Sequence, residues 1–396
     1  MPNKKKIFII AGEVSGDVLG ANIMRSMPGI KFVGVGGENM RAAGLKSIFP
    51  MSDLAVMGIV EVLSHASTLK QRVNQTVDAI INAAPDLVLT IDSPGFARAV
   101  ISKLRGSAAG RRLIARGLEF HHVVAPQVWA WRPGRAKKYA KTFDKLYAFF
   151  DFEIPYFTQY GLDTIAVGHP IADNIMGKYT AARQTRGDKV VALMPGSRKT
   201  EVEKLLPVFR GFVEKAPRGY KFVIPTVETT DAIVRAAVQR WKVKPEIIPA
   251  SDRYELYRKT FIAVAASGTV SAELAMMHIP AIIVYRMNWL TSMIGQMLVN
   301  VNWVSLVNIL LEKPVYPELL GVDATANNIL KQFKRIAKND NVRKKMIAEL
   351  KSADKLWRPD DTSVGARIAN HLKHTVFLNK KQTYAAARKL VLKKMK

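Results

Sequence analysis

Three turns in the sequence carry groups that could bind a phosphorylated ligand. They read "AGEVSGD" (11–17), "MPGSRKTEVE" (194–203) and "ASGTVSAELA" (266–275), and each follows a short apolar run and opens an amphipathic stretch. Free N–H groups at a helix start, aided by the helix dipole, bind phosphate, and small residues let it approach. Such turns are also common as plain structure in α/β proteins, so a single one is weak support for a site.

The second and third turns supply complementary groups. Gly196 and Ser197 open the second turn, and the guanidinium of Arg198 beside them could add a charge-assisted hydrogen bond to a diphosphate. In the third turn, Glu273 follows one helical turn after the small residues and could accept hydrogen bonds from both hydroxyls of a ribose. Together the two turns predict a nucleoside-diphosphate site. The small residues of the third turn are Ser267, Gly268 and Thr269.

Carboxylates mark the first turn and the end of another apolar run. Glu13 and Asp17 flank Ser15, which we expect to cap the following helix. In "LVLTIDSPGF", Asp92 ends a predicted buried strand, where a carboxylate could remove a proton from an acceptor hydroxyl. A helix-capping role for Asp92 fits the local sequence equally well.

The segment "APQVWAWRPGR" (125–135) has two interpretations. Trp129 and Trp131 flank one small residue, and Arg132 and Arg135 follow closely. The spacing is typical of an extended segment whose side chains alternate between core and surface. It is equally typical of a platform that meets the sugar-phosphate of an amphiphile.

The bulk composition restricts the function classes. The chain has 396 residues, no cysteine, and 60 Lys and Arg against 32 Asp and Glu, a formal net charge of +28. Such an excess favours an acidic partner: nucleic acid, an anionic lipid surface or a phosphorylated substrate. No RNA-binding motif, H-E-x-x-H, P-loop or G-x-S-x-G is present, so we expect no nucleic acid, no metal and no cofactor. An RNA-binding protein remains an alternative that depends on charge alone.

Short apolar runs alternate with amphipathic stretches along most of the chain, which is typical of α/β proteins with parallel sheets. The pattern restarts near residue 188, so we expect two doubly wound domains with ligands at the carboxyl ends of the strands. Helices are expected at Asp17–Met27, Thr68–Ala84 and Glu201–Lys215, and only helices after Asn339. The expected strands are Ile7–Ala11, Lys31–Val35, Leu87–Ile91, Phe120–Val124, Lys145–Phe149, Lys189–Met194, Tyr220–Ile224, Glu246–Ile248, Phe261–Ala265 and Ala281–Tyr285.

Two stretches favour contact with a membrane surface. Met287–Leu311 is uncharged and long enough to span a bilayer, but its four asparagines and one glutamine make a spanning helix costly. We therefore expect an interfacial or lipid-contacting segment there. Residues 376–396 hold seven Lys or Arg and no acid, which suits either a frayed basic tail or an anionic-membrane contact. We expect no signal peptide and a cytoplasmic protein.

Ordered motifs from residue 7 to about 320 resemble the lipid-A-disaccharide synthase family of inverting GT-B glycosyltransferases. They are "AGEVSGD", "VGVGGENM", "MGIVEVL", "TIDSPGF", "APQVWAWR", "VGHPIAD", "LMPGSRKTEVEKLLPVF", "ASGTVSAELA" and "YRMNWLT…VNWVSLVNILL". The resemblance implies transfer of 2,3-diacylglucosamine from its UDP derivative to 2,3-diacylglucosamine 1-phosphate. The products would be the β-1′,6-linked disaccharide 1-phosphate and UDP. Another GT-B UDP-sugar enzyme, such as an epimerase or a soluble transferase, is the alternative.

The resemblance also implies roles for single residues. Arg198 would meet the diphosphate and Glu273 the ribose, and Asn308 in "SLVN" matches an asparagine important for activity. Asp92 would be the general base, with Glu13, Ser15 and Asp17 facing the cleft on the acceptor side. The family usually has a "DAPDFN" pattern around this aspartate, whereas this chain has "DSPGFA".

The resemblance further implies an organisation and a set of partners. The domains would be an acceptor-side domain (1–175), a UDP-sugar-binding domain (176–340), helices crossing back to the first domain (341–377) and a basic tail (378–396). Acyl chains would meet the apolar segments Leu54–Leu63 and Met287–Leu311, with a core helix as the alternative for each. The protein would be peripheral on the cytoplasmic, anionic face of the inner membrane, with a homodimer as a further option.

Overall fold

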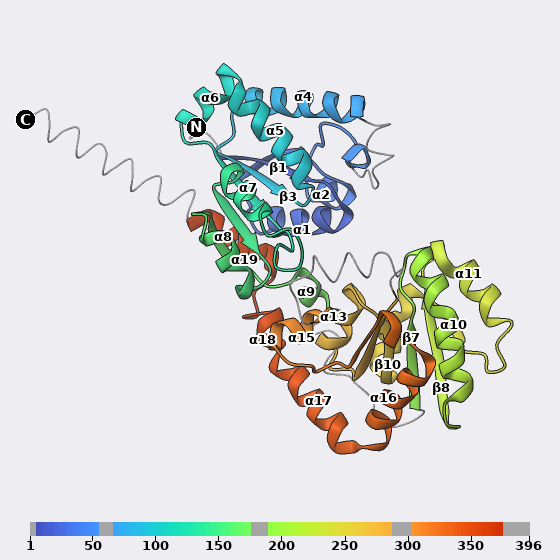
Figure 1. Ribbon diagram of the computed structural model, residues 1–396. Coiled ribbons are helices and arrows are strands. Elements are labelled where there is room, and N and C mark those ends of the chain that lie inside the picture. Colours follow the sequence, from blue (N-terminus) through green and yellow to red (C-terminus); the bar gives the residue numbers. More distant parts are fainter. Residues whose placement is uncertain (1–4, 55–65, 176–188, 287–302, 375–396) are drawn as a thin grey trace, which may run out of the picture. The chain divides into compact units, whose positions relative to one another are not determined.

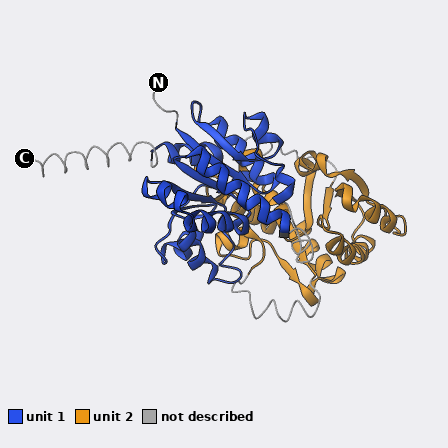
Figure 2. Cartoon of the chain, turned by 90° about the horizontal axis from the view of Figure 1, so that it is seen from above, with its two compact units in different colours: residues 1–170, 360–396 blue, residues 171–359 orange. Residues whose placement is uncertain are grey.

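The computed structural model describes residues 5–54, 66–175, 189–286 and 303–374 (Figure 1). Contacts divide the chain into unit 1, Met1–Pro170 with Asp360–Lys396, and unit 2, Ile171–Pro359 (Figure 2). Each unit holds a six-stranded parallel sheet flanked by helices, so the predicted α/β class with two doubly wound sheets is confirmed. Most of the apolar segment 54–63, the part of 287–311 up to residue 302, and the basic tail lie outside the described residues.

The sheet of unit 1 has the order β2-β1-β3-β4-β5-β6. Its strands are β1 (Lys6–Ala11), β2 (Lys31–Val35), β3 (Leu87–Ile91), β4 (Glu119–Val123), β5 (Lys145–Ala148) and β6 (Asp163–Ala166). Its helices are α1 (Val14–Arg25), α2 (Glu38–Ala42), α4 (Ala66–Ala83), α5 (Pro94–Gly106), α6 (Ala108–Ala115), α7 (Arg135–Thr142), α8 (Ile154–Thr158) and α19 (Val364–Leu372), with 3-10 turns η1 (Met51–Leu54) and η2 (Asp151–Glu153).

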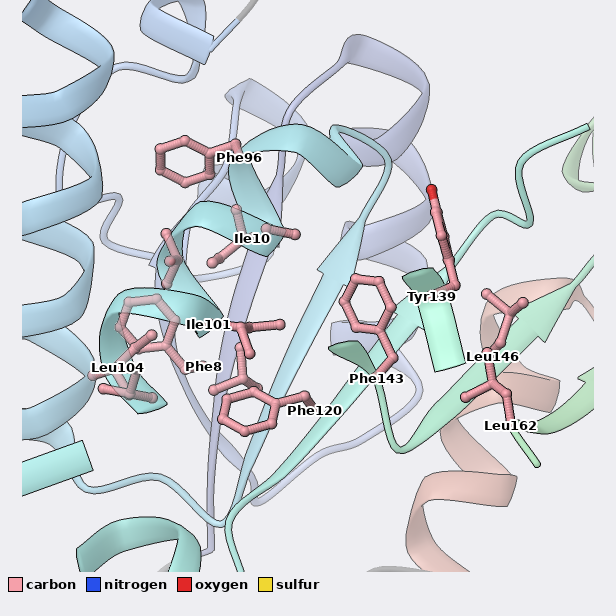
Figure 3. Packing of buried hydrophobic residues seen from close by; sticks show 14 of the residues in the cluster. Phe8, Ile10, Phe96, Ile101, Leu104, Phe120, Tyr139, Phe143, Leu146 and Leu162 are labelled. Carbon is pink, nitrogen blue, oxygen red and sulfur yellow. The ribbon is translucent and has the colours of Figure 1, made fainter. Parts of the chain in front are cut away.

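Both faces of this sheet are buried, which explains the nearly continuous apolar runs of its strands. Successive residues of β1 alternate between two core clusters: Phe8 and Ile10 belong to one, and Ile7 and Ile9 to the other. The first cluster includes residues of α4, α5 and α7 (Figure 3), and the second includes residues of α1, α2 and α19. Helices therefore cover the sheet on both sides.

The last described helix returns to the beginning of the chain. α19 packs on α1, where a Cβ added at Gly365 would lie 2.7 Å from the Cβ of Asn22. Beyond its end, the Nζ of Lys373 donates to the carbonyl of Ser26 at 2.8 Å. These contacts place the described residues after 360 in unit 1.

The sheet of unit 2 has the order β12-β11-β10-β7-β8-β9. Its strands are β7 (Lys189–Met194), β8 (Tyr220–Thr226), β9 (Glu246–Pro249), β10 (Thr260–Ala266), β11 (Ala281–Tyr285) and β12 (Glu318–Leu320). Its helices are α10 (Lys199–Lys215), α11 (Glu228–Val238), α12 (Arg253–Lys259), α13 (Thr269–Met276), α15 (Leu306–Leu311), α16 (Ala326–Lys338), α17 (Asp340–Ser352) and α18 (Asp354–Trp357), with 3-10 turns η4 (Ala250–Asp252) and η5 (Gly321–Asp323); α9 (Pro170–Ile175) spans the unit boundary.

All ten predicted strands are confirmed, with ends within two residues of those observed. The short edge strands β6 and β12 were not predicted. The three predicted helices are confirmed as α1, α4 and α10, but each begins two or three residues earlier than expected. The expectation that Ser15 caps α1 is wrong, because the helix already begins at Val14 and Glu13 occupies the capping position.

Candidate active site

The strand order of unit 1 reverses at β1 and β3, and two of the predicted turns meet there. Ala11 and Ile91 are register partners at the carboxyl ends of these strands. In doubly wound sheets, ligands bind outside the carboxyl ends at such a reversal. A Cβ added at Gly12 would lie 1.8 Å from the Oγ of Ser93, so only glycine lets the first turn approach the second this closely. The topology therefore brings Asp92 beside the first turn.

Asp92 adopts a strained backbone between β3 and α5. Its φ is 55° and that of Ser93 is 45°, a region that residues other than glycine rarely adopt. The Oγ of Ser15 lies 3.5 Å from a carboxylate oxygen of Asp92, and a Cβ added at Gly16 would lie 3.3 Å from the same oxygen. Ser93, not Asp92, occupies the capping position of α5, so the helix-capping alternative is wrong. Strain of this kind is typical of functional positions.

The surroundings of Asp92 make its carboxyl a weaker acid. Burial raises its pKa to about 6, the negative charge of Glu13 adds to the rise, and the hydrogen bond from Ser15 opposes it. A carboxylate with a pKa of about 6 is mostly ionised at neutral pH and still accepts a proton readily. Among the acceptor-side residues, Glu13, Ser15 and Asp92 are thus brought together.

Asp17 occupies a different environment. Its side chain is only 2% exposed, and its oxygens accept hydrogen bonds from the N–H groups of Gly37, Asn39 and Met40 and from the amide of Asn39, at 2.7 to 3.0 Å. Burial would raise its pKa, but these hydrogen bonds outweigh that effect and lower it. Asp17 therefore ties α1 to the start of α2.

The strand order of unit 2 reverses at β7 and β10, and the second and third turns meet there. Met194 and Ala265 are register partners at the carboxyl ends. A cavity of about 390 Å³ opens between the turns. Its lining includes every residue that was predicted for the nucleoside-diphosphate site: Gly196, Ser197, Arg198, Ser267, Gly268, Thr269 and Glu273.

Both turns leave backbone donors available at the cavity. No side chain caps α10 or α13, whose capping positions are Arg198 and Gly268. Gly196 has a φ of 101°, and a Cβ there would lie 2.9 Å from an oxygen of Glu201. The side chain of Arg198 is 76% exposed, and its guanidinium forms a 3.0 Å ion pair with Glu201. A surface pair of this kind is weak, so the arginine can reorient toward a ligand.

Glu273 is almost completely enclosed by donors that sequence reasoning missed. It is 5% exposed, and its oxygens lie 3.2 and 3.3 Å from the guanidinium of Arg253, 2.8 Å from the hydroxyl of Tyr257 and 3.3 Å from that of Tyr254. Burial would lower the pKa of Arg253, but the hydrogen bonds and charge of Glu273 raise it overall. Arg253 and Tyr257 also line the cavity. They lie at and beyond the start of α12, which follows β9 without a glycine turn to signal a site.

Asn308 lies apart from the cavity lining and is fully buried. Its amide donates to the carbonyl of Tyr316 and to Glu318, and its oxygen accepts from the N–H of Tyr316, each at 2.8 Å. Glu318 also accepts from the N–H groups of Val304 and Ser305, and Val304 accepts from the Oγ of Ser267 at 3.2 Å. Asn308 is therefore linked to the cavity through a chain of hydrogen bonds.

The two tryptophans of the segment 125–135 lie in different environments. Trp129 is 7% exposed, and its Nε1 donates to Glu153 at 3.4 Å, so it belongs to the core. Trp131 is 40% exposed, with the guanidinium carbons of Arg132 and Arg135 at 4.1 and 5.3 Å from its ring centre. The division between core and surface is confirmed, but the predicted extended segment is wrong, because the N–H groups of Ala130 and Trp131 both donate to the carbonyl of Gln127 and form a turn. The surface half is an aromatic–arginine cluster.

In residues 5–54, 66–175, 189–286 and 303–374, no group of three or more His, Asp or Glu side chains is arranged to hold a metal ion. Over the same ranges, no helix combines the length and apolar character that crossing a bilayer requires.

Comparison with known proteins identifies close relatives over most of the chain. The model of the lipid-A-disaccharide synthetase family matches residues 7–370. Lipid-A-disaccharide synthase of Rhodospirillum centenum is 40% identical over 356 residues, covering 86% of this chain and 87% of the relative. The same enzyme of Gluconobacter oxydans is 37% identical over 378 residues, covering 92% and 89%.

Solved structures share the fold at low sequence identity. A putative UDP-N-acetylglucosamine 2-epimerase from Listeria monocytogenes gives a TM-score of 0.61 at 15% identity, covering 94% of this chain and 96% of the other. The lipopolysaccharide outer core galactosyltransferase WaaB gives 0.53 at 13% identity, covering 95% and 99%. Taken with the two sheets and the sequence relatives, these matches show that the chain belongs to the lipid-A-disaccharide synthetase family and is a glycosyltransferase of the GT-B fold.

Proposed function

We propose that the chain transfers 2,3-diacylglucosamine from UDP-2,3-diacylglucosamine to the 6-hydroxyl of 2,3-diacylglucosamine 1-phosphate. The observation that carries this proposal is the cavity of unit 2, where two uncapped helix starts, Arg198 and the Glu273 cluster surround one space at the reversal of the strand order. Relatives that match most of the chain are named lipid-A-disaccharide synthases, which supports the choice of substrates.

The donor side accounts for departure of UDP. As the bond between the anomeric carbon and the UDP oxygen breaks, negative charge grows on the β-phosphate. Free N–H groups at the starts of α10 and α13 and the guanidinium of Arg198 stabilise that charge. Gly196, Ser197, Ser267, Gly268 and Thr269 keep the two turns small enough for the diphosphate to approach.

The ribose hydroxyls bind at Glu273. Its two oxygens already accept four hydrogen bonds, about the full capacity of a carboxylate. The two longest, at 3.3 Å from Tyr254 and Arg253, are the ones we expect the ribose diol to replace. Asn308 acts as a positioning residue, because its hydrogen bonds end at the segment that holds Ser267.

The acceptor side accounts for attack. Asp92 accepts the proton of the acceptor 6-hydroxyl while the 6-oxygen of the acceptor bonds to the anomeric carbon of the donor. The attack comes from the face opposite UDP, so the configuration of the anomeric carbon inverts. Glu13 raises the proton affinity of Asp92, and Ser15 orients its carboxylate. Asp17 holds the first turn in place without contacting substrate.

Unit 1 would then hold the acceptor and unit 2 the UDP-sugar, in line with the expected domains 1–175 and 176–340. Attachment to an anionic membrane surface would supply lipid substrates, and the net charge of +28 supports such attachment. A homodimer stays a prediction.

The test compares acylated and deacylated substrates. Purified protein is incubated with both lipid substrates in neutral detergent, and products are identified by mass spectrometry. We expect a tetraacyl disaccharide 1-phosphate that forms only with both substrates present and is nearly lost in Asp92→Asn and Arg198→Ala. Equal rates with deacylated substrates would favour a soluble UDP-sugar enzyme instead.

A further inference from the structure

The aromatic–arginine cluster of unit 1, which consists of Trp131, Arg132 and Arg135, has features that the proposed transfer does not yet use. Exposed tryptophans are uncommon on protein surfaces, and this one carries two guanidinium groups against its ring. Arg132 has a φ of 52°, so the backbone is strained where it aims this side chain. Strain held at a surface arginine points to a ligand that the arginine meets.

The hydrogen-bonding capacity of both guanidinium groups is largely unused. One terminal nitrogen of Arg135 donates to the carbonyl of Trp131 at 2.9 Å, which fixes the group beside the ring. Its Nε is buried and has no partner among the described residues. Neither arginine forms an ion pair with a carboxylate in the described part of the chain. The terminal nitrogens without a partner among the described residues could donate to an anion with several oxygens.

The cluster and the proposed base both follow the carboxyl ends of neighbouring strands, so they lie at the same end of the sheet. Asp92 donates its N–H to the carbonyl of Val123 at the end of β4, and the segment that carries Trp131 leaves that end. Arg135 and Tyr139 are four residues apart in α7, so they share one helix face about 6 Å apart along its axis. In Figure 3 the hydroxyl of Tyr139 points to the end of the sheet where the strand arrows end.

Electrostatic coupling supports this proximity. Burial raises the pKa of the Tyr139 hydroxyl, the positive charges of Arg135 and Arg98 lower it, and the negative charge of Asp92 raises it. The base and the arginines therefore act on one buried group. In the acceptor, the 1-phosphate on C1 and the 6-hydroxyl on the C5 substituent flank the same ring oxygen, so a base and a cationic cluster that both act on Tyr139 could meet the two groups of one sugar.

We propose that Arg132 and Arg135 bind the 1-phosphate of the acceptor and that Trp131 packs against its sugar ring, so that the 6-hydroxyl meets Asp92. The inference rests on the proposed function and adds to it the subsite that selects a phosphorylated acceptor. Two guanidinium groups suit a phosphate dianion because their charge-assisted hydrogen bonds to it are strong and Arg132 can donate two of them in parallel.

The experiment uses two acceptors that differ only at position 1: the 1-phosphate and the same sugar with a free 1-hydroxyl. Arg132→Gln and Arg135→Gln are compared with Lys137→Gln, which removes one charge from an exposed position of the same helix. We expect each arginine variant to raise KM for the phosphorylated acceptor by about tenfold or more. Rates with the 1-hydroxyl acceptor and KM for the donor should stay unchanged, and Lys137→Gln should match wild type.

Three results would overturn the inference. Equal losses on both acceptors would assign the arginines a structural role, and losses no greater than those of Lys137→Gln would remove the subsite. Unchanged kinetics in neutral micelles, with weaker binding to vesicles of anionic phospholipid, would assign the cluster to the membrane surface. If wild type forms no disaccharide at all, the proposed function itself fails, which distinguishes the two failures.

Discussion

At the scale of single residues, the carboxyl of Asp92 illustrates what local sequence leaves open. The sequence predicted that Asp92 ends a buried strand, but it was equally compatible with a general base and with a helix cap. Three-dimensional contacts decide between them: Ser93 takes the capping position, while Glu13 and Ser15, almost eighty residues away along the chain, set the environment of Asp92. Such contacts depend on strand order, which no local pattern encodes.

The pH dependence of kcat/KM should report on Asp92. A base with a pKa of about 6 must be ionised to act, so the rate rises with pH through about 6 and then levels. Glu13→Gln removes a neighbouring negative charge, which lowers the pKa, so the acid limb moves to lower pH. Ser15→Ala removes a hydrogen bond to the carboxylate, so the limb moves to higher pH. Both shifts are read from kcat/KM profiles for the acceptor.

The control for these profiles is Glu38→Gln, which removes an exposed carboxylate of unit 1 that does not act on Asp92. Its profile should overlay that of wild type. An acid limb that stays fixed in both Glu13→Gln and Ser15→Ala would mean that another group takes the proton.

Some residues of the donor cavity were predicted from the sequence, and others were not. Glycines, hydroxyl residues and Arg198 were found because they occupy short turns after apolar runs. Arg253 and Tyr257 were missed because a helix start without a small-residue turn gives no local signal. Asn308 came only from resemblance, since its partner Glu318 lies ten residues away beyond a turn.

At the scale of elements, strand prediction succeeded where both faces are buried. Central strands such as β3 (LVLTI) and β7 (KVVALM) are apolar apart from Thr90 and Lys189, and their limits were predicted to the residue. β6 and β12 are edge strands of four and three residues that begin with Asp163 and Glu318. The other two edge strands, β2 and β9, were predicted, so an edge position alone does not hide a strand from sequence patterns.

The junction of β1 and β3 offers a test of the turn packing. Gly12→Ala would place its Cβ on the side chain of Ser93, and we expect it to destabilise the protein by about 1–3 kcal/mol. Ser93→Gly alone should be neutral or stabilising, because a φ of 45° favours glycine. The double variant should regain most of the lost stability, measured by urea unfolding. Additive effects of the two changes would contradict the contact.

The change in Tm on substitution distinguishes the positioning role of Asn308 from the direct substrate contact of Arg198. Asn308→Ala leaves the N–H and carbonyl of Tyr316 without their buried partner, at a cost of about 2 kcal/mol. For a unit of this size, that lowers Tm by about 4–8 °C. Arg198→Ala removes only an exposed ion pair and should leave Tm nearly unchanged while kcat falls.

For Asn308, the outcome that would contradict a positioning role is a wild-type Tm combined with a large loss of kcat. Such a result would assign its amide a direct contact with substrate. A parallel loss of Tm and activity supports the positioning role.

At the scale of the whole molecule, the net charge of +28 exceeds what the two sites require. The described sites use only a few arginines, and seven Lys or Arg lie between residues 376 and 396. Removal of residues 378–396 should weaken binding to vesicles that contain anionic phospholipid, because each basic residue near such a surface contributes about 1 kcal/mol. Activity in neutral detergent should persist. Vesicle sedimentation at two salt concentrations measures the effect.

A full-length variant with those seven residues changed to Gln is the matched control for the truncation. It should bind anionic vesicles as weakly as the truncated chain, and neither should differ from wild type on neutral vesicles. Unchanged binding in both variants would place the membrane contact elsewhere in the chain.

The transfer reaction itself provides the most direct test of the proposed function. Protein, UDP-2,3-diacylglucosamine and 2,3-diacylglucosamine 1-phosphate are combined in neutral detergent without added metal, and the products are followed by NMR spectroscopy. We predict one UDP released per disaccharide formed, with a β linkage between the anomeric carbon and the 6-oxygen, and no release without acceptor. UDP release without acceptor, epimerisation of the UDP-sugar, or an α linkage would contradict the account.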